Sequence, residues 1–245
     1  MKKISDIRII KAQGTLSSNY IRRMVEIMIH YFQDPDLMEK VLYSHIEHAD
    51  TVRLAWNENQ IVGFSIASKL KQNTPFYPAP VNILFQRMLY LDPEVFYHGL
   101  GLRLAAATMR DLFGLFWPFK RFVTICRTQN PRVVKLMNMY NVTYPQYNQA
   151  LPAAIRKYGE SLLPLLGASE LDPKCRLIGT LDAFKDKDYT EIFNRFLRYN
   201  HNLYENMILE SAFRVEDGRI FNSGAFILLI GYARPLHFIR YLLHK

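Results

Sequence analysis

A pair of glycines between a predicted strand and a predicted helix is the part of the sequence best suited to chemistry. Residues 81–91 form an apolar, β-prone run, which Asp92-Pro93 ends because proline has no N–H to donate to a strand ladder. Gly99-Leu100-Gly101 follows, and apolar residues then recur at helical spacing. A helix N-terminus has unpaired N–H groups and a positive dipole end, and glycines let a phosphate approach closely. The order of strand, turn and helix therefore predicts an anion-binding site.

Two widespread phosphate-binding motifs do not fit this turn. The P-loop ends in Gly-Lys-Ser or Gly-Lys-Thr, and the sequence contains neither. The dinucleotide-binding fingerprint requires a third glycine at the position of Leu104. Taken alone, the two glycines could equally form a simple connection between a strand and a helix.

The residues around the turn resemble the acyl-coenzyme A signature of the GNAT superfamily of N-acetyltransferases. That signature is a hydrophobic residue, Asp or His, Pro and Glu, a short variable stretch, Arg or Gln, two residues, Gly, one residue, and Gly or Ala. The chain has Leu91-Asp92-Pro93-Glu94 and, after four further residues, Gly99-Leu100-Gly101. Phe96 stands at the Arg or Gln position, which keeps the turn but removes a polar group that usually lies near the pyrophosphate.

A second segment has the order and spacing of the same family. Residues 121–129 form a predicted buried strand, and Asn130 with the proline after it has the residue types that open a helix. In the family, an aliphatic residue follows this Asn three positions on, and a Leu-Tyr pair six and seven positions on. The aliphatic and leucine positions match, whereas Met137 replaces the tyrosine and Tyr140 comes one turn later. The resemblance covers about residues 50–142.

The resemblance implies roles for residues of both segments. The turn would hold the pyrophosphate of the coenzyme, and the strand before it would align the pantetheine arm. The residues implied for coenzyme binding are Leu89, Tyr90, Leu91, Gly99, Leu100, Gly101, Leu102, Arg103 and Asn130. The leaving thiolate needs a proton donor, for which Tyr140 is the first candidate and His98 and Tyr97 are rivals. Alternatives stay open, because Asn130 could act only as a helix cap and Tyr140 only as a packed side chain.

Length and composition bound the kind of protein. With 245 residues, 49% of them hydrophobic, the chain can bury a full core. Lys and Arg outnumber Asp and Glu by 31 to 22, which gives a net charge of +9 and a pI near 9.5. This charge favours an anionic partner but does not choose among coenzyme A, nucleic acid and a membrane surface.

Cysteine and histidine usage predicts neither disulfides nor a metal centre. Cys126 and Cys175 have no paired spacing, and His30, His45 and His48 share no ligand spacing with a carboxylate. The basic N-terminus meets charged residues before any apolar run long enough for a signal peptide. The longest late apolar run is far shorter than the roughly 20 residues of a spanning helix. We therefore expect a cytoplasmic protein without a metal.

The rest of the chain predicts the elements that would position the turn. Strands are expected at residues 4–12, 51–56, 61–68, 81–91, 121–129, 176–181, 207–215 and 219–232. Helices are expected at residues 19–33, 37–48, 102–116, 130–140, 151–166 and from 188 on, with a short basic helix after Pro235. Residues 69–80 are predicted to be a proline-containing loop that could wall an acceptor site, and residues 141–149 a polar boundary.

Together these features predict an α/β protein with a GNAT-like mixed, mostly antiparallel central sheet flanked by helices. Residues 1–149 would form the core that binds acyl-coenzyme A, and residues 150–245 a helical insert with late strands that complete the sheet, in the same domain or a separate one. The resemblance implies an N-acyltransferase that moves an acetyl group from its co-substrate, acetyl-coenzyme A, to a primary amine of a small molecule or a protein. Two alternatives stay open: a non-catalytic protein of this fold that binds an anionic partner, and an N-acyl synthase that uses a longer acyl chain carried by coenzyme A or an acyl carrier.

Overall fold

The computed structural model describes residues 7–12, 15–94, 99–180, 182–197 and 202–233, with the backbone alone at Tyr140, Asn202 and Ala233. Contacts within the chain define two compact units, which are described separately. The first is Met1–Leu70 with Leu84–Lys120, and the second is Lys71–Ile83 with Arg121–Lys245. The division at residues 149 and 150 that the sequence suggested stays a prediction.

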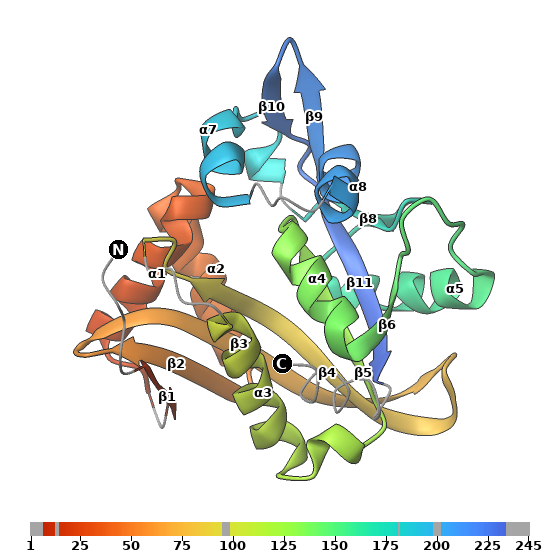
Figure 1. Cartoon of the computed structure of the whole chain (residues 1–245), viewed down its shortest axis with the longest axis horizontal. Helices are drawn as coiled ribbons and strands as arrows, with labels where there is room; N and C mark the ends of the chain where they lie inside the picture. The colour runs from red at the N-terminus through yellow and green to blue at the C-terminus, as the bar shows by residue number, and fades with distance from the viewer. Residues whose placement is uncertain (1–6, 13–14, 95–98, 181, 198–201, 234–245) are drawn as a thin grey trace. The chain divides into compact units, whose positions relative to one another are not determined.

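The first unit combines the inner parts of four strands with three α-helices (Figure 1). Its strands are β1 (Ile7–Lys11), β2 (Thr51–Asn57), β3 (Gln60–Thr74) and β4 (Tyr77–Leu91), neighbours in that order. Its helices are α1 (Ser18–Phe32), α2 (Pro35–Glu47), α3 (Leu100–Phe113) and the short 3-10 helix Trp117–Phe119. The side chain of Ser17 caps α1 and that of Asp34 caps α2, each by accepting a backbone N–H. The strands predicted at residues 51–56, 61–68 and 81–91 and the helices predicted at residues 19–33 and 37–48 are confirmed, and the described part of the strand predicted at residues 4–12 is β1. The helix predicted at residues 102–116 is also present as α3, but it ends at Phe113 rather than at residue 116.

The contacts of two successive residues of β3 show which helix covers which face of the sheet. Phe64 contacts Tyr90 with ring centroids 5.6 Å apart, and Phe32 of α1 contacts the same Tyr90 ring at 6.1 Å. The adjacent Gly63 points the other way, since a Cβ there would lie 3.5 Å from Leu104 of α3. Because successive residues of a strand face opposite sides, α1 and α3 pack on opposite faces of the sheet.

The prediction of a loop at residues 69–80 is wrong, because this segment is the outer end of a long hairpin. β3 and β4 extend through it, and only Pro75 and Phe76 make the turn between them. Exposed and half-buried residues alternate through residues 69–74, as expected for a ribbon with one face in water. The prolines of β4 are exposed, where a missing N–H is tolerated.

Aromatic contacts anchor the tip of this hairpin within the second unit. Phe76 stacks on Tyr144 and Tyr232, with ring centroids 6.2 Å and 4.8 Å away. The guanidinium of Arg121 lies 6.0 Å from the centre of the Tyr77 ring. Burial raises the pKa of Tyr77 and the positive charge of Arg121 opposes that shift, so the phenol stays protonated at neutral pH.

The second unit is built around a late strand that pairs on both of its edges. Its strands are β5 (Phe122–Thr128), β6 (Asn141–Tyr144), β7 (Glu170–Leu171), β8 (Arg176–Ile178), β9 (Phe213–Glu216), β10 (Arg219–Asn222) and β11 (Phe226–Ala233). Its helices are α4 (Pro131–Tyr140), α5 (Ala153–Ser161), α6 (Leu163–Leu166), the 3-10 helix Asp182–Phe184, α7 (Thr190–Ile192), the π-helix Phe193–Leu197 and α8 (Asn202–Ala212). β11 pairs antiparallel with β5 on one edge and with β6 and β8 on the other. β9 and β10 form a separate hairpin, drawn in blue in Figure 1.

Two further predictions for this unit are wrong. Residues 207–215 are not a strand, because α8 continues to Ala212 before β9 begins. Residues 219–232 are two strands, separated by a turn in which Gly224 has φ +76°. The segment predicted to be a polar boundary, residues 141–149, begins with β6, which pairs with β11, and its role as a domain boundary stays a prediction.

The observed architecture is mixed α/β, with a mostly antiparallel sheet flanked by helices, as the sequence predicted. The expectation that a late strand completes the sheet is confirmed by β11, which pairs with β5 from Val123 to Thr128. In the part of the chain that the structure describes, no helix combines the length and the hydropathy needed to span a lipid bilayer. The helix expected after Pro235 lies outside the described residues.

Candidate functional site

The predicted anion site is the N-terminus of α3. Gly99 is the N-cap, with φ +82° and ψ 2°, a left-handed conformation that favours glycine. The amide of Arg103 donates to the Gly99 carbonyl at 2.9 Å, which is the first bond of the helix. The amides of Leu100, Gly101 and Leu102 are therefore those that an α-helix leaves without an internal acceptor. Among the described residues, no heavy atom lies within 4 Å of a Cβ built on Gly99, so this part of the structure leaves space beside these amides.

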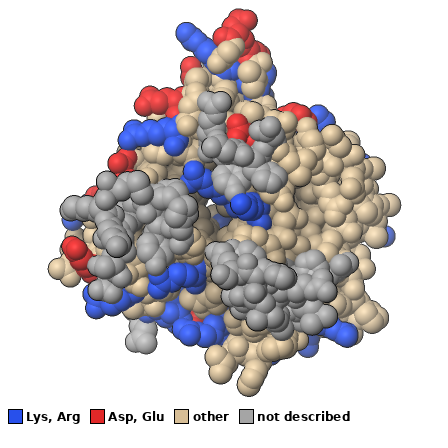
Figure 2. All heavy atoms as spheres, in the orientation of Figure 1, with Lys and Arg blue, Asp and Glu red and all other residues tan. Residues whose placement is uncertain are grey.

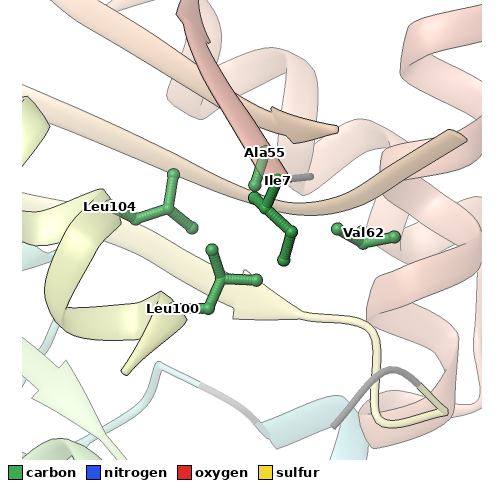
Figure 3. Close-up of a cluster of buried hydrophobic side chains, with 5 residues drawn as sticks. All are labelled: Ile7, Ala55, Val62, Leu100 and Leu104. Atoms are coloured by element: carbon green, nitrogen blue, oxygen red, sulfur yellow. The ribbon is translucent and has the colours of Figure 1, made fainter. Parts of the chain in front are cut away.

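An apolar cluster fixes the start of α3 against the sheet. The cluster consists of Ile7, Ala55, Val62, Leu100 and Leu104, whose side chains point toward one another in Figure 3. Leu89 and Leu91 of β4 are partly buried and pack against it. The structure thus brings three predicted coenzyme-binding residues, Leu89, Leu91 and Leu100, together through their side chains.

A close approach of two strands supports the same cluster. A Cβ on Gly63 of β3 would lie 2.7 Å from Leu91 Cδ2 and 3.1 Å from the carbonyl oxygen of Tyr90. A Cβ there would require the Leu91 side chain to move and the Tyr90 carbonyl to give by a few tenths of an ångström, so the position favours glycine. The strand was predicted from the sequence, but this preference was not.

Two side chains of α1 hold the end of β4, and sequence reasoning missed both. Arg23 forms an ion pair with Asp92, which is only 5% exposed. Asp92 in turn accepts the amide of Glu94 at 2.9 Å, and Tyr31 donates its hydroxyl to the Leu91 carbonyl at 3.0 Å. The partners lie 69 and 60 residues apart in the chain, so no local spacing signals them. In this structure Asp92 shapes the entry to the turn.

Arg103 and Tyr90 direct their side chains to the protein itself. The guanidinium of Arg103 donates to the Ile7 carbonyl at 3.1 Å, and its amide belongs to the first turn of α3. Tyr90 packs among aromatic rings, 5.7 Å from Tyr31 and 5.6 Å from Phe64 between centroids. Coenzyme binding through the positive charge of Arg103 and through the backbone of Tyr90 stays a prediction.

In the second unit, Asn130 caps α4. Its Oδ1 accepts the amide of Arg132 at 2.9 Å, and its own amide donates to Thr128 Oγ1 at 2.9 Å. Pro131 occupies the first helical turn, where its missing N–H is harmless. The capping function named as an alternative is therefore present, and the contact of Asn130 with a pantetheine arm stays a prediction.

The proposed proton donors are placed only in part. Tyr140 is the last residue of α4, and its backbone alone is described. Met137, one turn earlier, is 2% exposed. Tyr97 and His98 lie outside the described residues. Burial raises the pKa of the Cys126 thiol in β5 to about 12, so this cysteine is a neutral thiol near pH 7 rather than a nucleophile.

Within the ranges given above, no group of three or more His, Cys, Asp or Glu side chains is arranged to hold a metal ion.

No protein-family model matches the sequence, and no curated protein matches it. Among solved structures, the chain is similar to the protein PH1933 from Pyrococcus horikoshii OT3, with 14% identity over 58% of this chain and 92% of that chain and a TM-score of 0.45. It is similar to a GNAT-family acetyltransferase from Bacillus cereus ATCC 10987, with 15% identity, 61% and 89% coverage and a TM-score of 0.38. It is also similar to the GNAT-family N-acetyltransferase YhbS from Escherichia coli in complex with CoA, with 12% identity, 51% and 64% coverage and a TM-score of 0.37. At these levels of similarity, function has to be argued from the residues of this chain.

Proposed function

We propose that the chain is an acyltransferase that moves an acetyl or other acyl group from acyl-coenzyme A to a primary amine of a small molecule or a protein. The observation that carries the proposal is the N-terminus of α3, where a glycine cap with φ +82° leaves helix amides beside open space. The residues before it, Leu91-Asp92-Pro93-Glu94, and the turn Gly99-Leu100-Gly101 resemble the GNAT signature for acyl-coenzyme A. The anion expected at this turn is therefore the coenzyme pyrophosphate.

The predicted coenzyme-binding residues act mainly through the backbone. The amides of Leu100, Gly101 and Leu102 donate to phosphate oxygens, and the positive end of the α3 dipole stabilises the negative charge. The last residues of β4, Leu89–Leu91, align the pantetheine arm by strand-like pairing. Arg103 contributes positive charge beside the turn, since its side chain is exposed.

Transfer from a thioester to an amine needs orientation and two proton movements. The neutral amine attacks the carbonyl carbon, the nitrogen loses a proton to a base or to water, the carbon–sulfur bond breaks, and the departing thiolate takes a proton. Tyr140 is the proposed donor of that proton, with Tyr97 and His98 as rivals. The buried, neutral thiol of Cys126 favours direct transfer to the amine over an acyl-cysteine intermediate.

The binding step is tested at Gly99, because a side chain there enters open space and leaves the core untouched. Asp and Asn both tolerate the left-handed conformation and have nearly the same shape, so Gly99→Asp and Gly99→Asn differ in charge alone. We expect calorimetry to show coenzyme A binding at least about tenfold weaker for the Asp variant than for the Asn variant, because the carboxylate occupies and repels the phosphate site. Equal affinity of both variants and the unmodified protein would remove the turn from coenzyme binding.

The chemical step is tested by release of the coenzyme thiol from acetyl-coenzyme A in the presence of a panel of primary amines. With an accepted amine, Tyr140→Phe should lower kcat on the order of 10²-fold and leave coenzyme affinity nearly unchanged, because only a hydroxyl is removed. Normal turnover in this variant would exclude Tyr140 as the proton donor and leave Tyr97 and His98 as the candidates. Binding of coenzyme A without turnover on any amine would favour the non-catalytic alternative.

A further inference from the structure

The segment that follows α3 presents apolar side chains to solvent. Leu115, Phe116 and Phe119 are 73%, 69% and 63% exposed, more than any other large hydrophobic residue in the described part of the chain. All three fall within five consecutive residues. Figure 2 shows this end of the first unit as the tan tip at the lower edge, which corresponds to the end of α3 in Figure 1.

The exposed side chains of Leu115, Phe116 and Phe119 belong to a hydrogen-bonded turn. Trp117, in the middle of the segment, is only 6% exposed and anchors it to the protein. Its amide donates to the Gly114 carbonyl at 3.1 Å, and its carbonyl accepts the amide of Lys120 at 3.0 Å. Lys120 also donates from Nζ to the Phe113 carbonyl at 2.5 Å, at the C-terminus of α3. The neighbours of Trp117 therefore stay on the outside while the tryptophan is inside.

Basic side chains surround the base of this tip. Lys69 has its Nζ 5.7 Å from the centre of the Phe113 ring, and Arg110 is exposed in the last turn of α3. The carboxylate next to Arg110, Asp111, is paired with Arg53, so its charge is compensated. Asp50, whose carboxylate accepts the Lys69 amide at 2.6 Å, offsets one positive charge, and Lys120 adds another at the end of α3, so the cations Lys69, Arg110 and Lys120 outnumber this carboxylate.

The size and the charge of the tip indicate what kind of partner it could bind. At about 200 Å² for each large side chain, the three exposed residues present on the order of 400 Å², half of the roughly 800 Å² that each partner contributes to a standard protein interface. Aromatic and aliphatic side chains at a narrow tip with basic residues behind it match the interfacial region of a bilayer, where apolar groups enter the acyl boundary and cations meet anionic headgroups. We propose that the tip, residues 115–119, docks the protein reversibly on membranes that contain anionic lipids. This inference is independent of the proposed acyl transfer.

The test is sedimentation of the full chain with vesicles of phosphatidylcholine alone or mixed with phosphatidylserine, at low and high salt. The unmodified protein should sediment with the phosphatidylserine vesicles, and high salt should reduce this binding because it screens the charges. Substituting Leu115→Ser, Phe116→Ser and Phe119→Ser together should lower the partition coefficient about tenfold or more. A matched control with Tyr43→Ser, Leu203→Ser and Val215→Ser, at positions 51%, 43% and 57% exposed, should sediment like the unmodified protein.

Charge is tested separately by Arg110→Gln, which should reduce partition into phosphatidylserine vesicles about fivefold and leave binding to pure phosphatidylcholine unchanged. Circular dichroism of each variant verifies its fold. Equal sedimentation of the tip variant and the control variant would overturn the proposal. So would a salt-insensitive dimer in light scattering that the tip variant loses, because the occupant would then be a second copy of the chain.

Discussion

Replacing Gly63 by alanine tests how closely β3 approaches the end of β4. The added Cβ would lie 2.7 Å from Leu91 Cδ2, 3.1 Å from the Tyr90 carbonyl oxygen and 3.5 Å from Leu104 Cδ1. The Leu91 side chain can rotate away. The carbonyl belongs to the backbone of β4, however, so that strand has to shift for the methyl group to fit.

The magnitude follows from two opposing effects. Overpacking a core costs about 1–3 kcal/mol, whereas the lower entropy of the unfolded alanine chain returns about 0.5–1 kcal/mol. The expected net loss in the free energy of unfolding lies between about 0 and 2.5 kcal/mol. A loss of about 1 kcal/mol, near the middle of this range, lowers the Tm of a chain of this size by about 2–4 °C.

Urea unfolding followed by circular dichroism measures this loss, with Gly101→Ala as the matched control. A Cβ on Gly101 would meet Leu89 Cδ2 and Leu91 Cδ1 at 3.8 Å, which is ordinary contact. That variant should be as stable as the unmodified protein or up to about 1 kcal/mol more stable, since alanine favours a helix over glycine. Adding Leu91→Ala should relieve part of the strain of Gly63→Ala, so the double variant should lose less than the sum of the single losses. If Gly63→Ala is as stable as Gly101→Ala, the two strands are further apart than described.

Three other perturbations have definite expected outcomes. Arg23→Ala leaves the buried carboxylate of Asp92 without its ion-pair partner and should lower the free energy of unfolding by about 3–5 kcal/mol in urea; a loss below about 1 kcal/mol would contradict the pairing. Burial raises the pKa of Asp111, but hydrogen bonds from Arg53 outweigh this effect and leave the pKa below its usual value. Its stabilisation is therefore present above the unfolded pKa of about 4 and is lost as pH falls through the lower folded-state pKa, so Asp111→Asn should flatten stability against pH in that acid range. Because burial raises the pKa of the Cys126 thiol to about 12, iodoacetamide at a pH of about 8 should label this residue only after unfolding, and mass spectrometry of the folded protein should show it unmodified.

Elements with a strong local pattern could be predicted from the sequence. The apolar run at residues 81–91 is a strand that ends before Asp92-Pro93, and Asn130-Pro131 opens a helix with the expected cap. In both cases the signal lies in adjacent residues, because a proline or a capping side chain acts on its own backbone.

Elements whose pattern depends on distant partners were predicted poorly. Residues 69–80 look like a loop because of their prolines, yet both strands continue to a tip that Phe76 anchors on aromatic rings. Residues 207–215 suit a strand by composition, but burial at Met207, Ile208, Ser211 and Ala212 follows helical spacing. Tertiary packing overrides propensity at both places.

In the candidate site, too, the features set by neighbouring residues were predictable and those set by distant residues were not. The glycine turn and its place at the start of α3 were predictable, because positive φ and an uncapped N-terminus are local properties. The support from Arg23 and Tyr31 was not, since nothing near either residue in the sequence indicates Asp92 or Leu91 as its partner. The roles of the turn and of Tyr140 in chemistry stay predictions until a coenzyme is bound and an amine is acylated.

The pairing of β5 with β11 has a consequence for synthesis on the ribosome. Thr128 of β5 pairs with Ile227 of β11, and the rest of the shared edge lies still further apart in the chain. At about 5–20 residues per second, the partner of this edge emerges on the order of 5–20 s after β5 itself. During that interval the N–H and C=O groups along this edge of β5, a largely buried strand, have no β11 to bind, which is the condition that favours pairing between nascent chains. The order of strands in the sheet thus makes the interval between the two strands, rather than the stability of the finished fold, the stage at which this protein is most exposed to aggregation.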